Sequence, residues 1–493
     1  MAASFKVKAA RCPSNGSMAD NIDMTMIFFK FSSQKHSASG RVILCAIAVL
    51  AMLGTIADAA AQIRLPPVRL PTPGIGGLPD VVTPLRNSEL SVETRKLIDA
   101  RLARQRELLR QNGNVLELDP AGAPVRRAQL LAIGPSAQIL AAIAADGFRI
   151  IGERELAELE LKVFILQPPA GLALATALAR LRGLDPAGTY DYNHIYSDSG
   201  VIANRASATP GNASSRAVAD ADSPAPTNQS LQIGLIDGGV DRSHPVLTGI
   251  VIKPWGCAGK NMISAHGTAV ASLLVGKAGK FQGVIPGAML YAADVYCGTP
   301  TGGAVDSIVD ALAWMAREHI AVINLSLVGP PNLTLERVLK ILMARGHIVV
   351  AAAGNDGPAA PPLYPAAYAG VIAVTAVDAR ARVLPEACRG PHIAFAAPGS
   401  DMVAARVSAG VSSGDDGHLT NVRGTSFAAP IVAAMLAREL GNQNRNQNAG
   451  NPDPAGAAAA IAALVHQATD LGARGRDPIY GYGLVGMEYR NLP

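Results

Sequence analysis

Residues 231–241 read LQIGLIDGGVD, an apolar run that ends in an acid and two glycines. Other apolar runs of strand length follow at 289–295, 322–327, 348–353 and 371–377. Segments with helical periodicity lie between them, at 266–276, 305–318 and 333–345. Strands that are apolar throughout and alternate with helices are typical of a parallel sheet with helices on both faces. The sequence therefore predicts an α/β domain that begins near Leu231.

An acid and a histidine follow the first apolar run. Asp237 stands where the run ends, and open parallel sheets bind ligands at the carboxyl ends of their strands. By itself, an acid there is explained equally well as a residue that caps a turn. His266 comes 29 residues later, where a helix is predicted to begin. It could cap that helix, but an imidazole paired with a carboxylate is what a general base needs.

Two further motifs contain a hydroxyl and an amide. Ser426 lies in GTSFAAP, residues 424–430, at the start of another predicted helix. Free backbone N–H groups and the positive end of the dipole at a helix start suit a nucleophile whose partner becomes an oxyanion. Taken alone, a helix cap explains this serine better. Asn355 follows the apolar run at 348–353, where its amide can donate to an oxyanion or close a turn.

Together and in this order, five segments resemble motifs of the subtilisin-like serine peptidase family. They read IGLIDGGVDRSHP, AHGTAVASLL, VINLSL, AAAGNDG and GTSFAAPIVAA. The resemblance implies an α/β three-layer sandwich with a mostly parallel central sheet. It also implies a catalytic triad of Asp237, His266 and Ser426, with Asn355 and the Ser426 backbone N–H binding the oxyanion. The chain is accordingly interpreted as a serine endopeptidase that forms an acyl-enzyme on Ser426.

The same resemblance implies a strand that pairs with the main chain of an extended peptide. Asn324 is expected as a polar group behind this strand. The residues implied on the walls of the primary specificity pocket are Ser326, Leu327, Val328, Ala353, Gly354 and Leu363. The chain departs from the family at two of them, because Val328 replaces a usual glycine and Leu363 stands where small residues are common. Both changes predict a narrow pocket for small or medium apolar side chains.

The chain upstream of this domain, which spans 231–493, is divided into four parts. They are a leader with a signal peptide (1–61), a Pro-rich linker and helix (62–125), a compact unit (126–200) and a flexible linker (201–230). The compact unit reads strand, helix, strand, strand, helix, strand, a small α+β ferredoxin-like pattern. By pattern and position it resembles the family's inhibitory prodomain, with residues 193–196 in the active-site cleft. An accessory domain that stays attached is the alternative.

Processing and partners follow from this organisation. The prodomain is expected to act as an intramolecular inhibitor and folding aid, because parallel sheets need many long-range contacts before they become stable. Self-cleavage is expected between Tyr196 and Ser230, within or beside the Ser/Ala/Pro-rich linker. The expected partners are protein or peptide substrates. A net charge of +5 on 493 residues, without a long basic run, does not favour nucleic-acid binding.

The N-terminal segment predicts export. The apolar run VILCAIAVLAMLGTI, residues 42–56, follows three basic residues and precedes the small residues of ADAAA, 57–61. This order is typical of a signal peptide, and the run is shorter than the ~20 residues of a spanning helix. An uncleaved anchor is the alternative, and translation starting at Met24 or Met26 is another. The mature protein is expected to be secreted or periplasmic, with membrane contact only through the export signal.

Three cysteines lie outside the leader, and none has the spacing of a zinc site. The resemblance implies that Cys257 and Cys297 form a disulfide, because it makes their strands neighbours, and that Cys388 stays free. No metal site or cofactor is predicted. Many relatives carry a calcium loop after the histidine, but residues 275–281, VGKAGKF, offer few oxygen ligands. Calcium binding elsewhere is left open.

Two other functions compete with the endopeptidase. A non-catalytic, protease-like binding protein would keep the fold, but the complete triad argues against it. An esterase or amidase would use the same triad, but the expected peptide-binding strand at 324–327 favours extended peptides.

Overall fold

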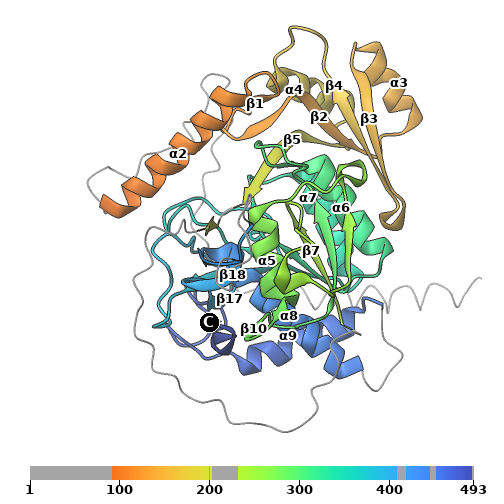
Figure 1. Cartoon of the computed structure of the whole chain (residues 1–493). Helices are drawn as coiled ribbons and strands as arrows, with labels where there is room; N and C mark the ends of the chain where they lie inside the picture. Colours follow the sequence, from red (N-terminus) through yellow and green to blue (C-terminus); the bar gives the residue numbers. More distant parts are fainter. Residues whose placement is uncertain (1–91, 199, 203–230, 408–417, 445–450, 491–493) are drawn as a thin grey trace, which may run out of the picture. The chain divides into compact units, whose positions relative to one another are not determined.

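The computed structural model describes residues 92–198, 200–202, 231–407, 418–444 and 451–490 (Figure 1). The predicted leader and most of the predicted linker at 201–230 lie outside these residues. In the described part of the chain, no helix combines the length and the apolar character needed to cross a membrane.

The predicted parallel sheet forms the centre of the domain that begins near Leu231, and it has seven strands. Its order is β17-β16-β15-β13-β7-β11-β8. The strands are β7 Gln232–Asp237, β8 Ile252–Trp255, β11 Met289–Asp294, β13 Val322–Leu325, β15 Ile348–Ala352, β16 Ile372–Val377 and β17 Ile393–Pro398. Almost every residue of β7, β11, β13, β15, β16 and β17 is buried, which explains their continuous apolar sequences.

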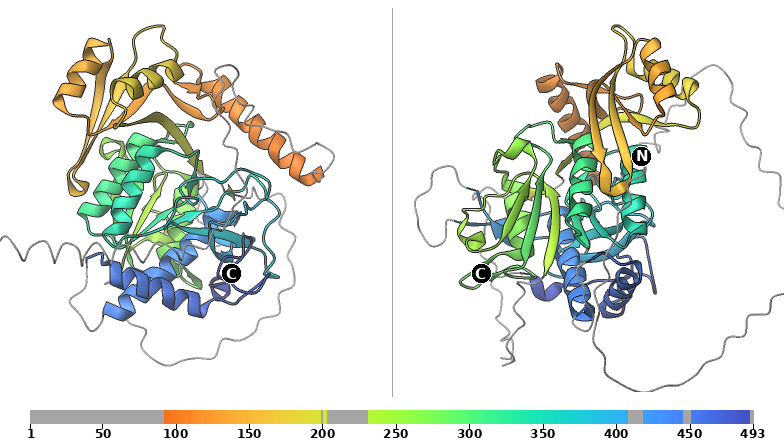
Figure 2. Two further views of the ribbon diagram at one scale, coloured as in Figure 1. Left: turned by 180° about the vertical axis from the view of Figure 1, so that it is seen from behind. Right: turned by 90° about the vertical axis from the view of Figure 1, so that its right-hand side faces the viewer.

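Helices cover both faces of this sheet (Figures 1 and 2). On one face lie α5 Ala265–Val275 and α8 Thr425–Asn444, and α9 Pro454–Gln467 contacts α8. On the other lie α6 Val305–Arg317 and α7 Leu333–Ala344. Successive side chains of β7 alternate between the two cores, because Leu235 packs with the first pair of helices and Ile236 with the second. The expected three-layer sandwich is confirmed.

The upstream unit is built on an antiparallel sheet. Its strands are β2 Pro124–Ile133, β3 Arg149–Leu156, β4 Leu161–Gln167 and β5 Thr189–Asp198, in the order β5-β2-β4-β3. Two helices, α3 Ala137–Ala145 and α4 Leu174–Leu184, share a core with this sheet. This is the predicted ferredoxin-like arrangement of two interlocked strand–helix–strand units.

The ends of the upstream unit differ from the prediction. The short strand β1 Leu116–Leu118 pairs with the start of β2, so ordered structure begins inside the segment assigned to a linker and helix. Leu116 is fully buried there, which gives the strand its packing. Helix α2 Val92–Asn112 precedes it. At the other end, β5 continues to Asp198, two residues beyond the segment 193–196 that was expected in the cleft, and these residues pair with Leu327 and Val328.

Candidate active site

Asp237 and His266 form a buried pair at the carboxyl end of the central sheet. Asp237 is the last residue of β7, and His266 is the second residue of α5. The His266 Nδ1 atom lies 2.9 Å from Oδ2 and 3.0 Å from Oδ1 of Asp237. The Ser264 hydroxyl caps α5 by accepting a bond from the Gly267 N–H, so His266 does not serve as the cap.

The environment of His266 sets its charge. Burial disfavours the imidazolium, but the charge of Asp237 and its hydrogen bond, with a contribution from Asp198, raise the pKa of His266 to about 9. The buried Nε2 atom has no hydrogen-bond partner among the described residues. An imidazole held through Nδ1 by a carboxylate, with Nε2 directed elsewhere, is arranged to exchange a proton at Nε2.

Ser426 is fully buried in the first turn of α8. Its hydroxyl donates to the Ser326 carbonyl at 3.3 Å, and its own carbonyl accepts from the Ser326 hydroxyl at 2.9 Å. The Asn324 amide donates to that same hydroxyl at 2.8 Å. The aromatic ring of Phe427 lies 5.2 Å from the imidazole of His266, centroid to centroid. These contacts fasten the start of α8 to the edge where Asp237 and His266 lie.

Asn355 follows β15, and its orientation is fixed from α8. The Thr425 N–H donates to the Asn355 Oδ1 atom at 3.1 Å, and the Thr425 hydroxyl accepts from the Gly354 N–H at 3.0 Å. Because Oδ1 serves as the acceptor, the Nδ2 group of the amide is the donor on the other side. The N–H of Ser426 is a second backbone donor, in the first turn of α8.

Chain from the upstream unit lies across this edge of the sheet. The end of β5 pairs antiparallel with β12 Gly303–Ala304, with Tyr196 opposite Gly303. It also pairs with β14 Leu327–Val328, with Asp198 opposite Leu327. Of the predicted peptide-binding strand at 324–327, only Leu327 pairs with β5, whereas Asn324 and Leu325 belong to β13 of the central sheet. Tyr196, within the segment 193–196 expected in the cleft, is fully buried.

Beyond Asp198 the chain continues past the imidazole. A Cβ added to Gly200 would lie 3.1 Å from His266 Nε2 and would collide with the ring of Phe427, so a side chain has no room there. The strand β6 Val201–Ile202 then pairs with β19 Leu419–Arg423, which leads into α8. A polypeptide therefore runs along the candidate catalytic residues on both sides of them.

The residues implied on the pocket walls come together at β14 and β15. Val328 is half-buried and pairs with Ser197, and Ala353 and Gly354 follow β15. Leu363 is buried, and its Cδ1 atom occupies the place where a Cβ on Gly354 would lie. Leu363 therefore fills space beside Gly354, and the narrow pocket stays a prediction.

The sequence analysis did not identify two of the features that contact Tyr196, namely β12 and Gly329. Strand β12 has only two residues and lies in a Gly-rich segment, so no periodicity marked it. The two consecutive glycines, Gly302 and Gly303, could have indicated a close approach of another chain segment. A Cβ on Gly302 would collide with the carbonyl oxygen of Tyr196. Gly329 was also missed, although its lack of a side chain makes room for the Tyr196 ring, 2.6 Å from where its Cβ would lie.

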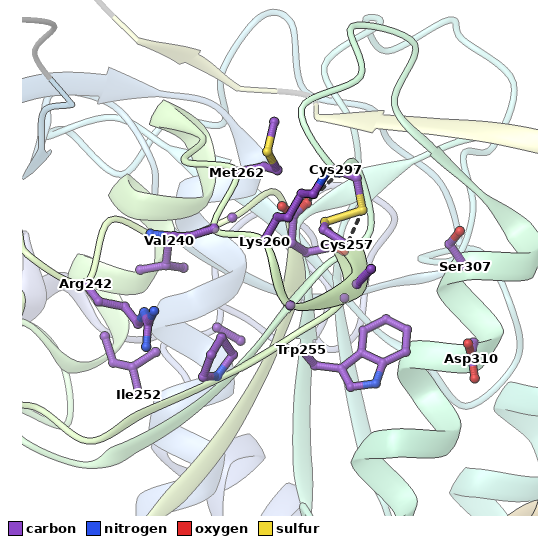
Figure 3. Close-up of a pocket in the computed structure, with 18 of the residues that line it drawn as sticks. Val240, Arg242, Ile252, Trp255, Cys257, Lys260, Met262, Cys297, Ser307 and Asp310 are labelled. Carbon is purple, nitrogen blue, oxygen red and sulfur yellow. Dashed lines mark hydrogen bonds between the residues drawn. A yellow bond between two sulfur atoms is a disulfide. The ribbon is translucent and has the colours of Figure 1, made fainter.

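The cysteines are arranged as expected. Cys257 and Cys297 form a disulfide (Figure 3). Cys388 is free and buried. Among the described residues, a single group has the composition of a metal site, Cys257, Asp294 and Cys297, and its two sulfur atoms are bonded to each other. Burial raises the pKa of the Cys388 thiol to about 12, so the thiol is neutral at ordinary pH.

Comparison with known proteins gives a family. A sequence model of the subtilase family matches residues 228–483. The alkaline protease of Alkalihalobacillus alcalophilus is 30% identical over 354 residues, which cover 70% of this chain and 85% of that protein. Subtilisin BL of Lederbergia lenta is 32% identical over 270 residues, covering 53% and 91%. The minor extracellular protease Epr of Bacillus subtilis is 28% identical over 266 residues, covering 52% of this chain.

The match spans only 38% of the length of Epr, although it spans most of the other two relatives. Among solved structures, fervidolysin from Fervidobacterium pennivorans, a keratinolytic enzyme related to subtilisin, has a TM-score of 0.62 at 21% identity. That match covers 76% of this chain and 62% of fervidolysin, and it concerns the fold alone. On the strength of the family model and the match to the alkaline protease, this chain belongs to the subtilase family.

Proposed function

We propose that this protein is a secreted serine endopeptidase that first cuts its own chain and then hydrolyses other polypeptides. The observation that carries the proposal is the path of β5 and β6, which lie on either side of the candidate catalytic residues. An endopeptidase must hold a chain that continues in both directions from the bond it cuts. A site for small esters or amides has no need of strands on both sides.

Each residue has a role in the proposed mechanism. Ser426 attacks the peptide carbonyl while His266 Nε2 takes the proton from its hydroxyl. Asp237 orients the imidazole through Nδ1 and stabilises its charged form. The Asn355 amide and the Ser426 N–H bind the oxyanion. His266 returns the proton to the leaving amine, and water then releases the acyl group from Ser426.

The proposed self-cleavage lies beside residue 199. Asp198 pairs with Leu327 before the site, and Gly200 lies against His266 and Phe427. We therefore propose that Ser426 attacks one of the two peptide bonds between Asp198 and Gly200. This position falls within the range 196–230 proposed from the sequence, and the released upstream unit would remain as an inhibitor until it dissociates.

The same register supports a preference for substrates. Tyr196, which lies upstream of the proposed cut, packs on Gly329 and donates its hydroxyl hydrogen to the Pro330 carbonyl. The narrow space beside Leu363 and Gly354 favours small or medium side chains at the residue before the cut. We propose that good substrates have a tyrosine a few residues upstream of the cut and a small residue just before it. The proposed reaction uses no cofactor.

Ser426→Ala tests the function. The variant should fail to hydrolyse casein and should keep its upstream unit, while the wild type should shorten to a new N-terminus near Gly200. Loss of the nucleophile should lower turnover by several powers of ten, about 10⁶-fold in a related triad. N-terminal sequencing and casein hydrolysis are measured on both purified proteins.

The alternatives give different results in the same experiment. Equal casein hydrolysis by Ser426→Ala would refute the assignment of the nucleophile. A shortened Ser426→Ala protein would mean that another protease makes the cut. A wild type that binds casein without cutting it would be the non-catalytic binding protein, and one that cuts only small esters would be the esterase.

A further inference from the structure

Two short strands hold the segment that leads to the proposed cut, and they differ in their attachment. Strand β14 follows the buried central strand β13 after one residue, and Ser326 between them is bonded to Ser426. Strand β12 has no such neighbour in the central sheet, since its pairing is with β5. It is followed directly by α6, whose first residue Val305 is fully buried, and preceded by a loop, residues 296–302. The packing of α6 therefore holds the C-terminal end of β12, and the loop determines how its N-terminal end is held.

A buried carboxylate fixes the beginning of the loop. Asp294, the last residue of β11, accepts bonds at Oδ1 from the N–H groups of Tyr296 and Cys297, at 2.9 and 2.8 Å. Its side chain is buried, and the residue pairs in register with Asp237 on β7. Asp294 therefore fixes the direction in which the chain leaves the central sheet, next to the candidate catalytic acid.

The disulfide provides the second attachment. Cys297 is bonded to Cys257, which follows β8 at the edge of the central sheet, and both have left-handed φ angles, +50° and +53°. Such angles are uncommon for a residue with a side chain, so they need a restraint from the surrounding structure. Packing gives little restraint here, because a cavity of about 750 Å³ borders both cysteines (Figure 3).

We infer that the Cys257–Cys297 disulfide positions β12 as the outer wall of the peptide-binding groove, so that it controls binding of substrates that extend several residues upstream of the cut. This inference rests on the proposed function. Short substrates that do not reach β12 contact β14, β19 and the candidate catalytic residues. The disulfide therefore affects the binding of long substrates but not of short ones, and it leaves the chemical step unchanged.

Two fluorogenic peptides test the inference. The long one copies residues 194–203 and reaches β12 through Ile195 and Tyr196, and the short one copies residues 198–203. After self-processing, the Cys257→Ser/Cys297→Ser double variant should bind the long peptide about tenfold more weakly, because main-chain hydrogen bonds contribute about 1 kcal/mol each. The change should appear in KM with kcat preserved. The short peptide should be cut equally well by the variant and the wild type.

Cys388→Ser is the matched control, because Cys388 is the third cysteine of the described chain and takes no part in the disulfide. If the double variant does not fold, the same comparison is made on processed wild type and processed Cys388→Ser, before and after a dithiol reductant. Both should lose the long-peptide preference and regain it on reoxidation.

Equal losses for the two peptides, or no loss for either, would overturn the role of the disulfide. A loss that appears in kcat would also overturn it, because that result would indicate damage to the catalytic residues. If the wild type cuts neither peptide and no casein, the endopeptidase proposal fails first and the inference falls with it.

Discussion

The candidate catalytic residues and the segment that lies across them are held in different ways. Asp237, His266 and Ser426 are buried, and strands or helix starts of one parallel sheet carry them. The segment from Tyr196 to Ile202 is held by short edge strands, and Ser197 and Asp198 remain exposed to solvent. The candidate catalytic residues therefore lie in the core. The segment from Tyr196 to Ile202 is held by edge-strand contacts that a bound substrate would make in its place.

After Ser426→Ala, the largest effect is expected from Asn355→Ala, because Asn355 belongs to the buried set of candidate catalytic residues. Loss of one oxyanion donor typically lowers kcat by about 10²–10³-fold. Self-cleavage and casein hydrolysis should fall together, since both use the same donor. The variant's thermal unfolding should be recorded as a control, because Asn355 also accepts a bond from Thr425. Loss of one activity without the other would contradict a single shared site.

Gly329→Ala tests the contacts that hold the segment from Tyr196 to Ile202. The added methyl group would meet the Tyr196 ring at 2.6 Å, so the ring must move. We expect about tenfold weaker binding of peptides with a tyrosine at this position, through KM. Peptides with alanine there should be unaffected. Equal effects on both peptides would show that the glycine matters for the fold of the strand, and not for the fit of the ring.

Asp198→Asn should change the pH dependence of self-cleavage alone. With its pKa raised to about 9, His266 in the intact chain is mostly protonated at pH 7 and cannot accept the Ser426 proton. Asp198 contributes to this rise, so its neutral replacement lowers the pKa and moves the onset of self-cleavage to lower pH. The Asp198 side chain is exposed, so we expect the shift towards lower pH to be small.

The control for this variant is the processed enzyme. Once the upstream unit has left, Asp198 is gone from the site, and peptide hydrolysis should have the same pH profile in the variant and the wild type. The rate of shortening of the intact chain is followed by gel between pH 5 and 10. An identical profile for intact variant and intact wild type would refute the influence of Asp198 on His266.

The sequence allowed the parallel sheet and the residues of the candidate site to be predicted, since buried strands are apolar throughout and the motifs stand at their carboxyl ends. Asn324 was expected behind the site, and it does reach Ser426 through Ser326. The strands β12, β14 and β6 have two residues each, which is too short for any periodicity. Their pairing depends on where β5 ends, a long-range contact that local pattern does not encode.

The smallest effect is expected from helix α2, which attaches the upstream unit near the oxyanion donor. Arg101 and Arg104 both reach Asp356, the residue after Asn355, at 3.3 and 3.0 Å. Arg104 is largely exposed and Arg101 partly so, and exposed ion pairs contribute about 0–1 kcal/mol. In Arg101→Ala/Arg104→Ala, the cleaved upstream unit should dissociate about threefold faster, which shortens the lag before casein hydrolysis begins. Arg106→Ala is the matched control, because Arg106 lies on the same helix and is not a partner of Asp356.

High salt should shorten the lag of the wild type towards that of the double variant, because ions screen the exposed pairs. A lag that neither salt nor the double substitution changes would mean that β5 alone retains the upstream unit, and that α2 contributes nothing to inhibition.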